Sequence, residues 1–406
     1  MSEINGKHGT GREPAGLAAR LLALVSNQET TSRTELARQL GVAPSTISAV
    51  VGQLIERGVL AEQGVQSSTG GRPRKVLRLG ARDAFAVAAD LGGQHARIGV
   101  VRPGGRCESV RSVSFDITTG PDEGLSLLVR QLQPMIEQTS GTLSAVGVAL
   151  PGPVDVDTGV VDRPSRMPGW NQYGVRDRLQ EEFDATVWVD NDANAMAIGE
   201  HAVRPADHRH VILVKAGTAI GAGIMIDGEL YRGATGAAGD ISHVRLEAVG
   251  DRPCSCGNTG CLETVASGAA LRQSLTESGV VVAGTDDVVR LALDGHPQAT
   301  TAVRRAGSLL GQVLAANVNF FNPDLVVVGG SLSTLEPFVA AVRSKLYDAC
   351  HPIITQKLVV ERTVLGADAG LVGAGTGALA AALDSTLEGF HPVTAAPSAR
   401  RQHARV

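Results

Sequence analysis

The sequence predicts an α/β protein with a small helical module and a β-wing at its N-terminus, followed by a larger module of two similar lobes. Three observations support this prediction: three helical patterns before residue 58, two short strand patterns after them, and apolar strands alternating with helical stretches from Phe85 onward. At 406 residues, 43% of them apolar and 19% charged, the chain is long enough for more than one globular domain. We place the boundary between the modules at residues 82 and 83.

The N-terminal module begins with three helical patterns. The first places apolar residues at helical spacing over residues 17–25. The second opens at Ser32 with Glu35 three residues further on, which is a capping-box pattern. The third spans residues 44–57 and starts with a proline, which suits a first helical turn. Two helices joined by a short turn form the arrangement that presents its last helix to the major groove of DNA.

Two strand patterns follow the helices, at residues 59–60 and 76–79, and a loop rich in Gln, Ser, Thr and Gly separates them. The loop ends in residues 70–75, where glycine and proline keep the backbone extended and the arginines could lie in a narrow minor groove. A three-helix unit that binds no nucleic acid is the alternative to a winged helix-turn-helix. The predicted DNA contacts are Ser45, Thr46, Ser48, Arg72, Arg74 and Lys75.

Charge is divided unevenly between the two modules. Residues 1–82 carry eleven basic and six acidic side chains, a net +5, so the remaining residues carry −9 of the total of −4. This asymmetry suggests a polyanionic partner at the N-terminal end only. No apolar run approaches the roughly 18 residues of a spanning helix, and the N-terminus lacks the apolar core of a secretory signal. We therefore expect a cytoplasmic protein without a membrane partner.

The larger module contains two similar units of strand, glycine turn and strand, with Gly92 and Gly217 125 residues apart. Their repetition suggests two lobes that each offer backbone N–H groups to a phosphate. Glycines at hairpins are also common for steric reasons alone. A further close backbone approach is expected where the apolar strand at residues 325–328 ends. The predicted cofactor-binding residues are Asp90, Gly92, Gly93, Gly217, Thr218 and Gly330.

Acidic and amide residues follow the strand at residues 187–189 and precede a helical stretch. In α/β folds, ligands bind at the carboxyl ends of strands. Asp192 could therefore act as a general base toward a hydroxyl, and Asn191 could hydrogen-bond another hydroxyl. The alternative is helix capping, for which Asp and Asn are common.

Three of the five cysteines lie within eight residues, which is too close for an ordinary disulfide framework and typical of metal ligands. His243 lies eleven residues before the first of them, Cys254. Together with Cys256 and Cys261 these residues would complete a tetrahedral zinc site with no open position, so the zinc would be structural. A set of unligated thiols is the alternative.

These motifs together resemble the ROK family, named for repressors, open reading frames and kinases, over nearly the whole chain. The most specific are residues 190–194 (Asp-Asn-Asp-Ala-Asn), residues 239–243 and the Cys-x-Cys-Gly-x-x-Gly-Cys-Leu-Glu run at residues 254–263. The resemblance is to the repressor branch. It implies a winged helix-turn-helix at residues 15–82 and a two-lobed, actin-like (ribonuclease H-like) sugar-kinase fold at residues 83–384. We expect residues 1–14 to be flexible and residues 385–406 to be a disordered tail.

The resemblance also implies which residues form the site. Asp192 would be the base in kinase members, and His243 with the three cysteines would hold zinc. The residues implied to bind the sugar are Asn191, Asp192, Asp240, His243 and Glu263.

Several residues differ from the pattern that sugar kinases usually show. Gln94 replaces a threonine in the first glycine turn, and Ala219 adds a methyl group where the backbone of the second turn should approach phosphate. Asp240 replaces a glutamate and is one methylene shorter, and Ser242 replaces a glycine. ATP and Mg²⁺ are therefore less expected than zinc.

Two functions follow. The favoured hypothesis is a sugar-responsive transcriptional regulator, a repressor that binds palindromic operator DNA as a homodimer or homotetramer and a sugar or sugar phosphate as effector. The alternative is an ATP-dependent hexose kinase of the glucokinase type, including a bifunctional protein. A DNA-binding scaffold with an inactive pocket is a third hypothesis.

Overall fold

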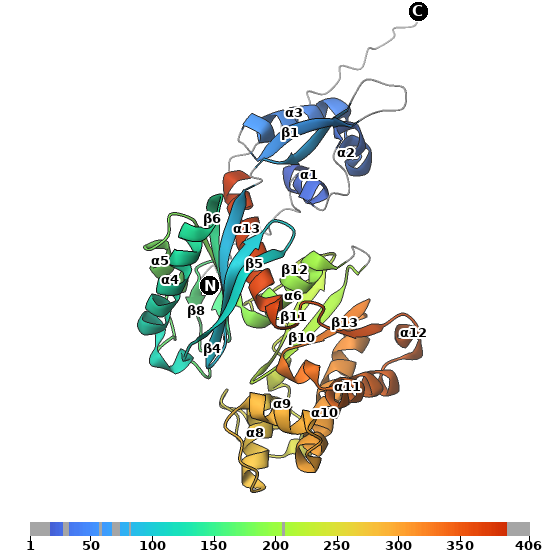
Figure 1. The fold of residues 1–406 in the computed structure, drawn as a ribbon. Helices are drawn as coiled ribbons and strands as arrows, with labels where there is room; N and C mark the ends of the chain where they lie inside the picture. Colours follow the sequence, from blue (N-terminus) through green and yellow to red (C-terminus); the bar gives the residue numbers. More distant parts are fainter. Residues whose placement is uncertain are drawn as a thin grey trace, which may run out of the picture. The chain divides into compact units, whose positions relative to one another are not determined.

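The computed structural model describes residues 17–26, 32–56, 59–66, 74–80, 83–204 and 208–387. The chain divides into two compact units (Figure 1). The N-terminal unit comprises Met1–Ala84 together with Leu383–Val406, and the lobed unit comprises Phe85–Ala382. Each unit is described by itself below.

The N-terminal unit contains the three predicted helices and both predicted strands of the wing. The strands pair antiparallel, with Leu60 opposite Leu79 and an irregularity in the register after Glu62. The elements are α1 (Leu17–Ser26), α2 (Arg33–Leu40), α3 (Pro44–Glu56), β1 (Leu60–Gln66) and β2 (Arg74–Leu79).

The predicted cap of the second helix is confirmed. The Ser32 hydroxyl accepts a hydrogen bond from the Glu35 backbone N–H at 3.2 Å, and Gly41 ends α2 in the left-handed conformation at φ 66°. Leu383, near the end of the last helix of the chain, packs against the apolar core of this unit. That core includes Leu21, Leu22, Leu36, Ile47, Val51, Leu54, Leu60 and Leu77.

The lobed unit contains two five-stranded sheets with the same strand order. When the five strands of each sheet are numbered along the chain, both sheets have the order 3-2-1-4-5. The prediction of two similar lobes is therefore confirmed. The first sheet, β5-β4-β3-β6-β9, consists of β3 (Ala84–Leu91), β4 (His95–Arg102), β5 (Arg106–Ser114), β6 (Thr142–Leu150) and β9 (Thr186–Asn191). The second, β12-β11-β10-β13-β14, consists of β10 (Val211–Ala216), β11 (Ile220–Ile226), β12 (Glu229–Tyr231), β13 (Leu325–Gly329) and β14 (Val359–Arg362).

Helices cover these sheets and complete two separate cores. In the first lobe, α4 and α5 pack against the sheet around Trp170, and in the second, α8 to α11 pack around Phe338. A short strand pair, β7 (Val154–Asp155) and β8 (Val160–Val161), lies between β6 and α5 in the chain. The helices are α4 (Pro121–Gln138), α5 (Val175–Gln180), α6 (Asp192–Val203), α7 (Glu263–Ala266), α8 (Gly268–Glu277), α9 (Thr285–Leu293), α10 (Pro297–Phe321), α11 (Glu336–Ala349), α12 (Pro352–Thr355) and α13 (Ala369–Leu387).

Helices α6 and α13 pack on both sheets and on each other. Small residues allow their backbones to touch: a Cβ on Gly373 would lie 1.6 Å from the carbonyl oxygen of Ala195, and a Cβ on Gly199 would lie 2.3 Å from that of Ala369. Because α6 begins at Asp192, this packing determines where the predicted catalytic residue lies. The two helices thus join the lobes at the site.

The segment 366–386, which includes most of α13, is the one described helix long and apolar enough to cross a membrane, with a mean hydropathy of 1.2. This differs from our expectation that no apolar run has that length. Half of the segment is buried, against the first sheet and α6, so packing within the protein explains its apolar composition. The helix also continues to Leu387, past the expected start of the tail at residue 385, and residues 388–406 lie outside the described residues.

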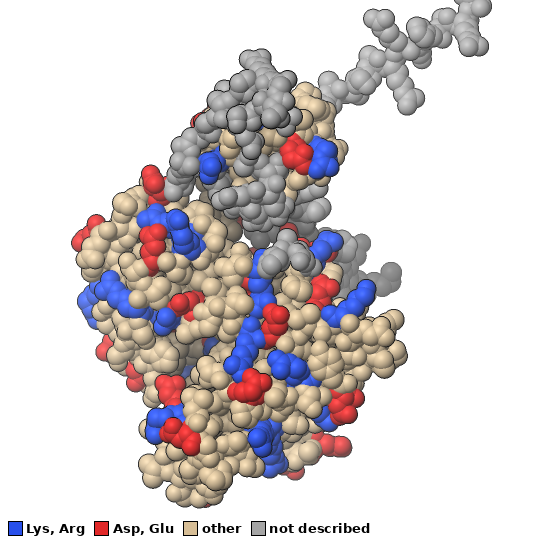
Figure 2. Space-filling model, turned by 45° about the vertical axis from the view of Figure 1, so that its right-hand side comes forward, with Lys and Arg blue, Asp and Glu red and all other residues tan. Residues whose placement is uncertain are grey.

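Figure 2 shows basic and acidic side chains interspersed over the visible face of the lobed unit. The lobed unit contains ion pairs between residues three or four apart in the sequence, such as Arg178 with Glu182 at 2.8 Å and Arg290 with Asp287 at 3.0 Å. Exposed pairs of this kind contribute little stability.

Candidate functional site

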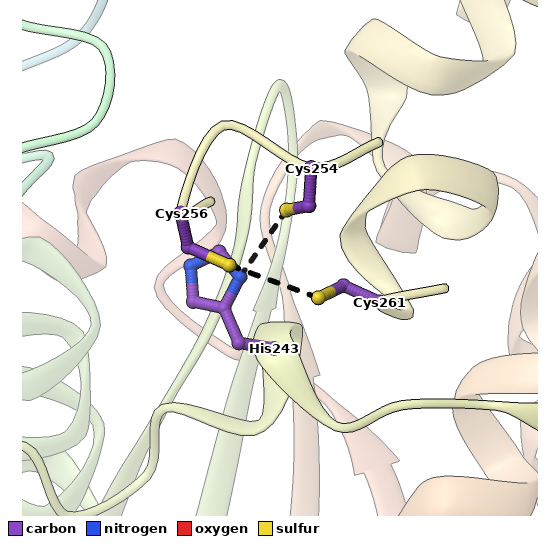
Figure 3. A group of neighbouring side chains, drawn as sticks. All are labelled: His243, Cys254, Cys256 and Cys261. Atoms are coloured by element: carbon purple, nitrogen blue, oxygen red, sulfur yellow. Dashed lines mark hydrogen bonds between the residues drawn. The ribbon is translucent and has the colours of Figure 1, made fainter. Parts of the chain in front are cut away.

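Four predicted metal ligands come together in the second lobe. His243 ends a short 3₁₀ turn (Ile241–His243), and the three cysteines lie in the loop that leads into α7. Their ligand atoms all lie within 4.8 Å of one another (Figure 3). Cys254 Sγ is 3.4 Å from His243 Nδ1, and Cys256 Sγ is 3.8 Å from Cys261 Sγ.

These separations suit a tetrahedral ion between the four atoms. At the tetrahedral angle, bonds of about 2.3 Å to sulfur and 2.1 Å to nitrogen place two sulfurs about 3.8 Å apart, and a sulfur and a nitrogen about 3.6 Å apart. The loop is held in shape by a hydrogen bond from Cys254 N–H to the Asn258 carbonyl at 2.8 Å. Gly257 and Gly260 have positive φ values of 90° and 74°, and the turns that they form direct the cysteines toward one another. The four residues therefore fit a bound metal ion.

Glu263 follows this cluster directly and is buried at the start of α7. Its Oε2 accepts a hydrogen bond from the Ile220 backbone N–H at 3.0 Å, and its Oε1 lies 2.7 Å from an Arg166 nitrogen. Burial raises the pKa of Glu263, and the Arg166 charge opposes that rise. The carboxylate thus connects the metal cluster to the turn after β10.

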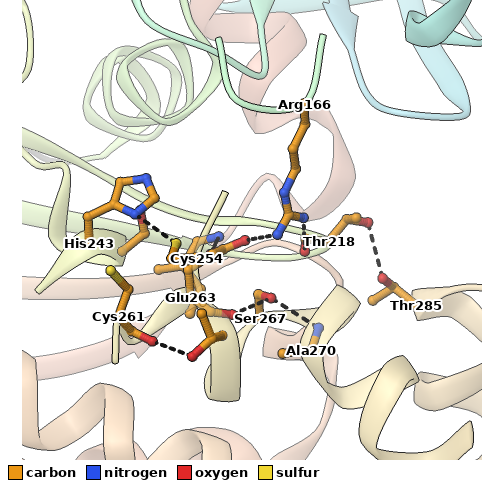
Figure 4. A network of polar contacts seen from close by, with 12 residues as sticks. Arg166, Thr218, His243, Cys254, Cys261, Glu263, Ser267, Ala270 and Thr285 are labelled. Carbon is orange, nitrogen blue, oxygen red and sulfur yellow. Dashed lines mark hydrogen bonds and ion pairs between the residues drawn. The ribbon is translucent and has the colours of Figure 1, made fainter. Parts of the chain in front are cut away.

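Arg166 reaches this carboxylate from the other lobe. It lies in the loop between β8 and α5, and it also donates a hydrogen bond to the Thr218 carbonyl at 3.3 Å. Figure 4 shows its guanidinium pointing toward both groups. Sequence reasoning missed this residue, because an arginine in a proline-containing loop resembles an ordinary solvated side chain.

Asp192 lies at the first position of α6, with its side chain only 7% exposed. Its Oδ2 is 2.6 Å from the Nζ of Lys215, a residue of β10 whose side chain is 20% exposed. Burial lowers the pKa of Lys215, but Asp192 and Asp90 together outweigh that effect, so the pKa is raised. Sequence reasoning missed Lys215 as well, although a single charge in the otherwise apolar strand 211–216 was a usable signal.

Asp90, the second-last residue of β3, acts electrostatically on the same ammonium group. Burial and the neighbouring Asp192 carboxylate raise the pKa of Asp90 to about 7, while Lys215 and Arg97 oppose that rise. A Cβ on Gly370 would lie 2.2 Å from Asp90 Oδ2, so the start of α13 closes over this carboxylate. Two carboxylates and one ammonium therefore share this part of the site.

The predicted sugar ligand Asn191 is engaged as the N-cap of α6. Its Oδ1 accepts a hydrogen bond from the Ala193 N–H at 2.9 Å, and its Nδ2 donates one to the Gly152 carbonyl at 3.1 Å. The capping alternative therefore applies to this residue. Its neighbour Asp190 is buried and accepts two hydrogen bonds from Arg232, at 2.6 and 3.1 Å.

Of the two remaining predicted sugar ligands, Asp240 lies three residues before the metal cluster begins and His243 belongs to it. Asp240 is exposed, and its Oδ1 accepts a hydrogen bond from the Ser242 hydroxyl at 2.8 Å. His243 faces Cys254 through Nδ1, which leaves Nε2 as the ring nitrogen that could meet a ligand hydroxyl.

The glycine turns use their first N–H groups internally. Gly92 N–H donates to the His95 carbonyl at 2.9 Å, and Gly217 N–H donates to the Ala219 carbonyl at 3.1 Å. At these two positions the steric alternative is therefore supported, since both N–H groups close the turns.

The other predicted phosphate-turn residues lie close by. Gly93 accepts a hydrogen bond from Ile117 through its carbonyl, and the Thr218 hydroxyl lies 3.1 Å from that of Thr285. Gly330 is at φ 80°, and a Cβ on it would lie 2.4 Å from the Ala216 carbonyl oxygen. The expected close approach therefore occurs between two segments of the protein backbone.

The predicted DNA contacts on α3 lie at the surface. Ser45 and Ser48 are exposed, and Thr46 is half-buried. Arg74 and Lys75 belong to β2, opposite Gln66 and Val65. Arg72 lies outside the described residues.

The duplicated sheets, with buried carboxylates where the lobes meet, define a two-lobed, actin-like protein of the sugar-kinase type. The ROK family model matches residues 86–381, and the chain belongs to the ROK family. It is 30% identical over 345 residues to a putative xylose repressor of Caldicellulosiruptor sp. (strain Rt8B.4), covering 80% of this chain and 86% of the relative.

Two solved structures are similar in fold. A ROK family transcriptional regulator, a homologue of the Escherichia coli MLC protein, superposes with a TM-score of 0.73 at 24% identity, covering 91% of this chain and 98% of that one. A ROK hexokinase from Thermus thermophilus superposes with a TM-score of 0.61 at 31% identity, covering 74% of this chain and 99% of the hexokinase. The family thus includes both regulators and sugar kinases.

Proposed function

We propose that this protein is a sugar-responsive transcriptional regulator, a repressor that binds operator DNA through the N-terminal unit and a sugar or sugar phosphate through the lobed unit. One observation carries this proposal. The described residues between 17 and 80 lie outside the family match at 86–381, and they form three helices followed by a β-hairpin. A sugar kinase has no need of such a unit, whereas a regulator does.

The N-terminal unit supports DNA binding by its geometry. Helix α3 follows α2 after a short turn and exposes Ser45 and Ser48, small hydroxyl side chains that suit phosphates and base edges. We propose Thr46, Arg72, Arg74 and Lys75 as further contacts. A homodimer or homotetramer of such units would bind a palindromic operator, because half-sites repeat the symmetry of the protein. A function on operator DNA implies a cytoplasmic protein.

The lobed unit supports sugar binding by its polar residues near the lobe junction. Asp192, Glu263, Asp240 and the free edge of the His243 ring offer hydrogen-bond partners for hydroxyl groups, and Asn191 fixes the start of α6 beside them. Residues from both lobes meet there, so a bound sugar can change how the lobes close. That change must make different contacts in the two arrangements to alter DNA affinity.

We propose that the metal of the His243 cluster is zinc, and that it is structural. Three thiolates and one imidazole match the preference of zinc, and four protein ligands leave no position for a substrate. Because the cluster precedes Glu263 directly, zinc would hold that carboxylate in place. The cluster thus supports the sugar pocket without taking part in chemistry.

We do not favour the hexose kinase alternative. Its base, Asp192, would have to accept a proton from a sugar hydroxyl. That transfer would neutralise the carboxylate that lies 2.6 Å from the largely buried Lys215 ammonium. Leaving a buried charge unpaired is costly.

DNA binding can be tested by selecting genomic fragments with the purified full-length protein and measuring affinity by fluorescence anisotropy. Ser48→Glu should weaken binding at least about tenfold, because a carboxylate on the exposed face of α3 repels phosphates. Thr301→Glu places the same charge on an exposed position of α10 in the lobed unit and should have no effect. Selection of no preferred sequence would reject the proposal.

Sugar response can be tested on the same selected DNA. A panel of sugars and sugar phosphates should contain a compound that changes the DNA affinity of the wild type. Asp192→Asn should keep DNA binding and zinc content but lose that response. A response that survives this substitution would place the effector elsewhere.

A further inference from the structure

The actin-like sugar-kinase fold implies a nucleotide with Mg²⁺ between the lobes, and the residues of this chain do not suit that group. In such a site, Mg²⁺ binds one or two carboxylates together with phosphate oxygens and water. Asp90 and Asp192 are the two carboxylates in the corresponding places, at the end of β3 and the start of α6. The space at Asp192 is taken by a side chain of the protein itself.

That side chain is Lys215. Its Nζ lies 2.6 Å from Asp192 Oδ2, and Asp90 acts electrostatically on the same ammonium. Lys215 comes from β10, immediately before the glycine turn at residues 217–219. The four residues before it, from Val211 to Val214, are buried and apolar, so the lysine is the one charge that this strand carries into the site.

The charges of the site also match an ammonium better than a divalent ion. Lys215 supplies one positive charge to Asp90 and Asp192, with Glu263 acting on it more weakly. A divalent ion would balance both aspartates as carboxylates, whereas one ammonium balances only one. Burial accordingly raises the pKa of Asp90 to about 7, so this second carboxyl group keeps much of its proton near neutral pH.

We propose that the Lys215 ammonium takes the place of a divalent cation between Asp90 and Asp192, so that the pocket binds its ligand without a metal ion and does not assemble a magnesium nucleotide. Lys215 is then the residue that separates a ligand-sensing site from a phosphoryl-transfer site in this chain. That the site binds a ligand rests on the proposed function, whereas the exclusion of a divalent ion by Lys215 is measurable without DNA or sugar.

The test is a titration of the zinc-loaded full-length protein with Mn²⁺, followed by the paramagnetic signal of free Mn²⁺. The wild type should show no saturable binding up to about 1 mM. Lys215→Met approximately keeps the length of the side chain and removes its charge. This variant should bind one equivalent of Mn²⁺ at least about tenfold more tightly than the wild type does. The double variant Lys215→Met/Asp192→Asn should lose that equivalent again.

Lys215→Arg is the matched control, because it keeps the positive charge and should gain no Mn²⁺. A folded Lys215→Met protein that binds no more Mn²⁺ than the wild type would overturn the proposal. If Lys215→Met does not fold, the test is the melting temperature of the wild type with and without Mg²⁺ and ATP. An unchanged melting temperature supports the proposal, and a Mg²⁺-dependent increase that Asp192→Asn removes overturns it.

Discussion

The charge of Asp90 makes the stability of the lobed unit depend on pH in an unusual direction. Most acidic groups of a protein have a lower pKa when folded, and they stabilise it as pH rises. The pKa of Asp90 is about 7 in the folded protein, against an ordinary value of 3.8 in the unfolded chain, because the carboxyl group is buried beside Asp192. Asp90→Asn removes the titration and keeps the size of the side chain.

The sign and size follow from proton binding in the two states. Between pH 4 and 7 the folded protein keeps the Asp90 proton and the unfolded chain does not, so the contribution of Asp90 to stability falls as pH rises. One pKa unit corresponds to about 1.4 kcal/mol, which gives a total of at most about 4 kcal/mol. About 3 kcal/mol of this total falls between pH 5 and pH 8.

The assay compares the melting temperatures of wild type and Asp90→Asn at pH 5 and pH 8. From pH 5 to pH 8, the melting temperature of the variant should rise relative to that of the wild type by roughly 6–12 °C, since each kcal/mol is worth about 2–4 °C in a domain of this size. Asp184→Asn, at an exposed position, is the control and should gain nothing on the wild type. An equal difference between Asp90→Asn and wild type at both pH values would refute the reasoning.

Three further predictions concern the metal cluster and the packing around the site. Elemental analysis should find one equivalent of zinc in the wild type and none in Cys256→Ser, because this change removes one of four ligands. Cys350→Ser, at a buried thiol outside the cluster, should keep the metal. Gly373→Ala should lower the free energy of unfolding by more than about 3 kcal/mol in urea titrations, because its Cβ would lie 1.6 Å from the Ala195 carbonyl oxygen and α13 would have to move away from α6. A loss below about 1 kcal/mol would contradict the packing. Arg166→Met should cost about 1–3 kcal/mol in the same titrations, because it leaves a buried carboxylate unpaired, and changing that carboxylate to its amide should restore part of the loss. An unaltered stability would mean that the ion pair contributes nothing.

Most of the fold could be predicted because its signals are local. The Ser32 cap and the two strand-turn-strand units are short patterns, and the structure contains all of them. The packing of α13 could not be predicted in the same way, because four glycines between Gly370 and Gly377 are unfavourable in an isolated helix by about 1 kcal/mol each. They fit here because a Cβ at each position would collide with a neighbour, namely the Asp90 carboxylate, the Ala195 carbonyl of α6 or the side chains of Val101 and Trp188, and no local pattern reveals these contacts.

The site could be predicted only where its residues are neighbours in the sequence. The cysteine run and His243 lie within nineteen residues and come together as predicted. The partners of the two cations could not be predicted from the sequence. Lys215 lies 23 residues from Asp192, and Arg166 and Glu263 belong to different lobes. Asn191 shows a further limit, because a cap and a ligand have the same local sequence and only the Ala193 N–H contact distinguishes them.

A regulator and a kinase place different demands on one pocket. A kinase has to stabilise a transition state, which requires a free base and a cation that binds the transferred phosphate. A sensor needs only to bind its ligand in the ground state and to prefer one arrangement of the lobes. Under our proposal, the Lys215 ammonium, 2.6 Å from Asp192, occupies the carboxylate that a kinase would need as base and metal ligand, while Asp240 and His243 are proposed to bind hydroxyl groups. We therefore expect a sugar-kinase fold to keep ligand recognition without catalysis where, as proposed for Lys215, a cation of the protein itself pairs with the aspartate.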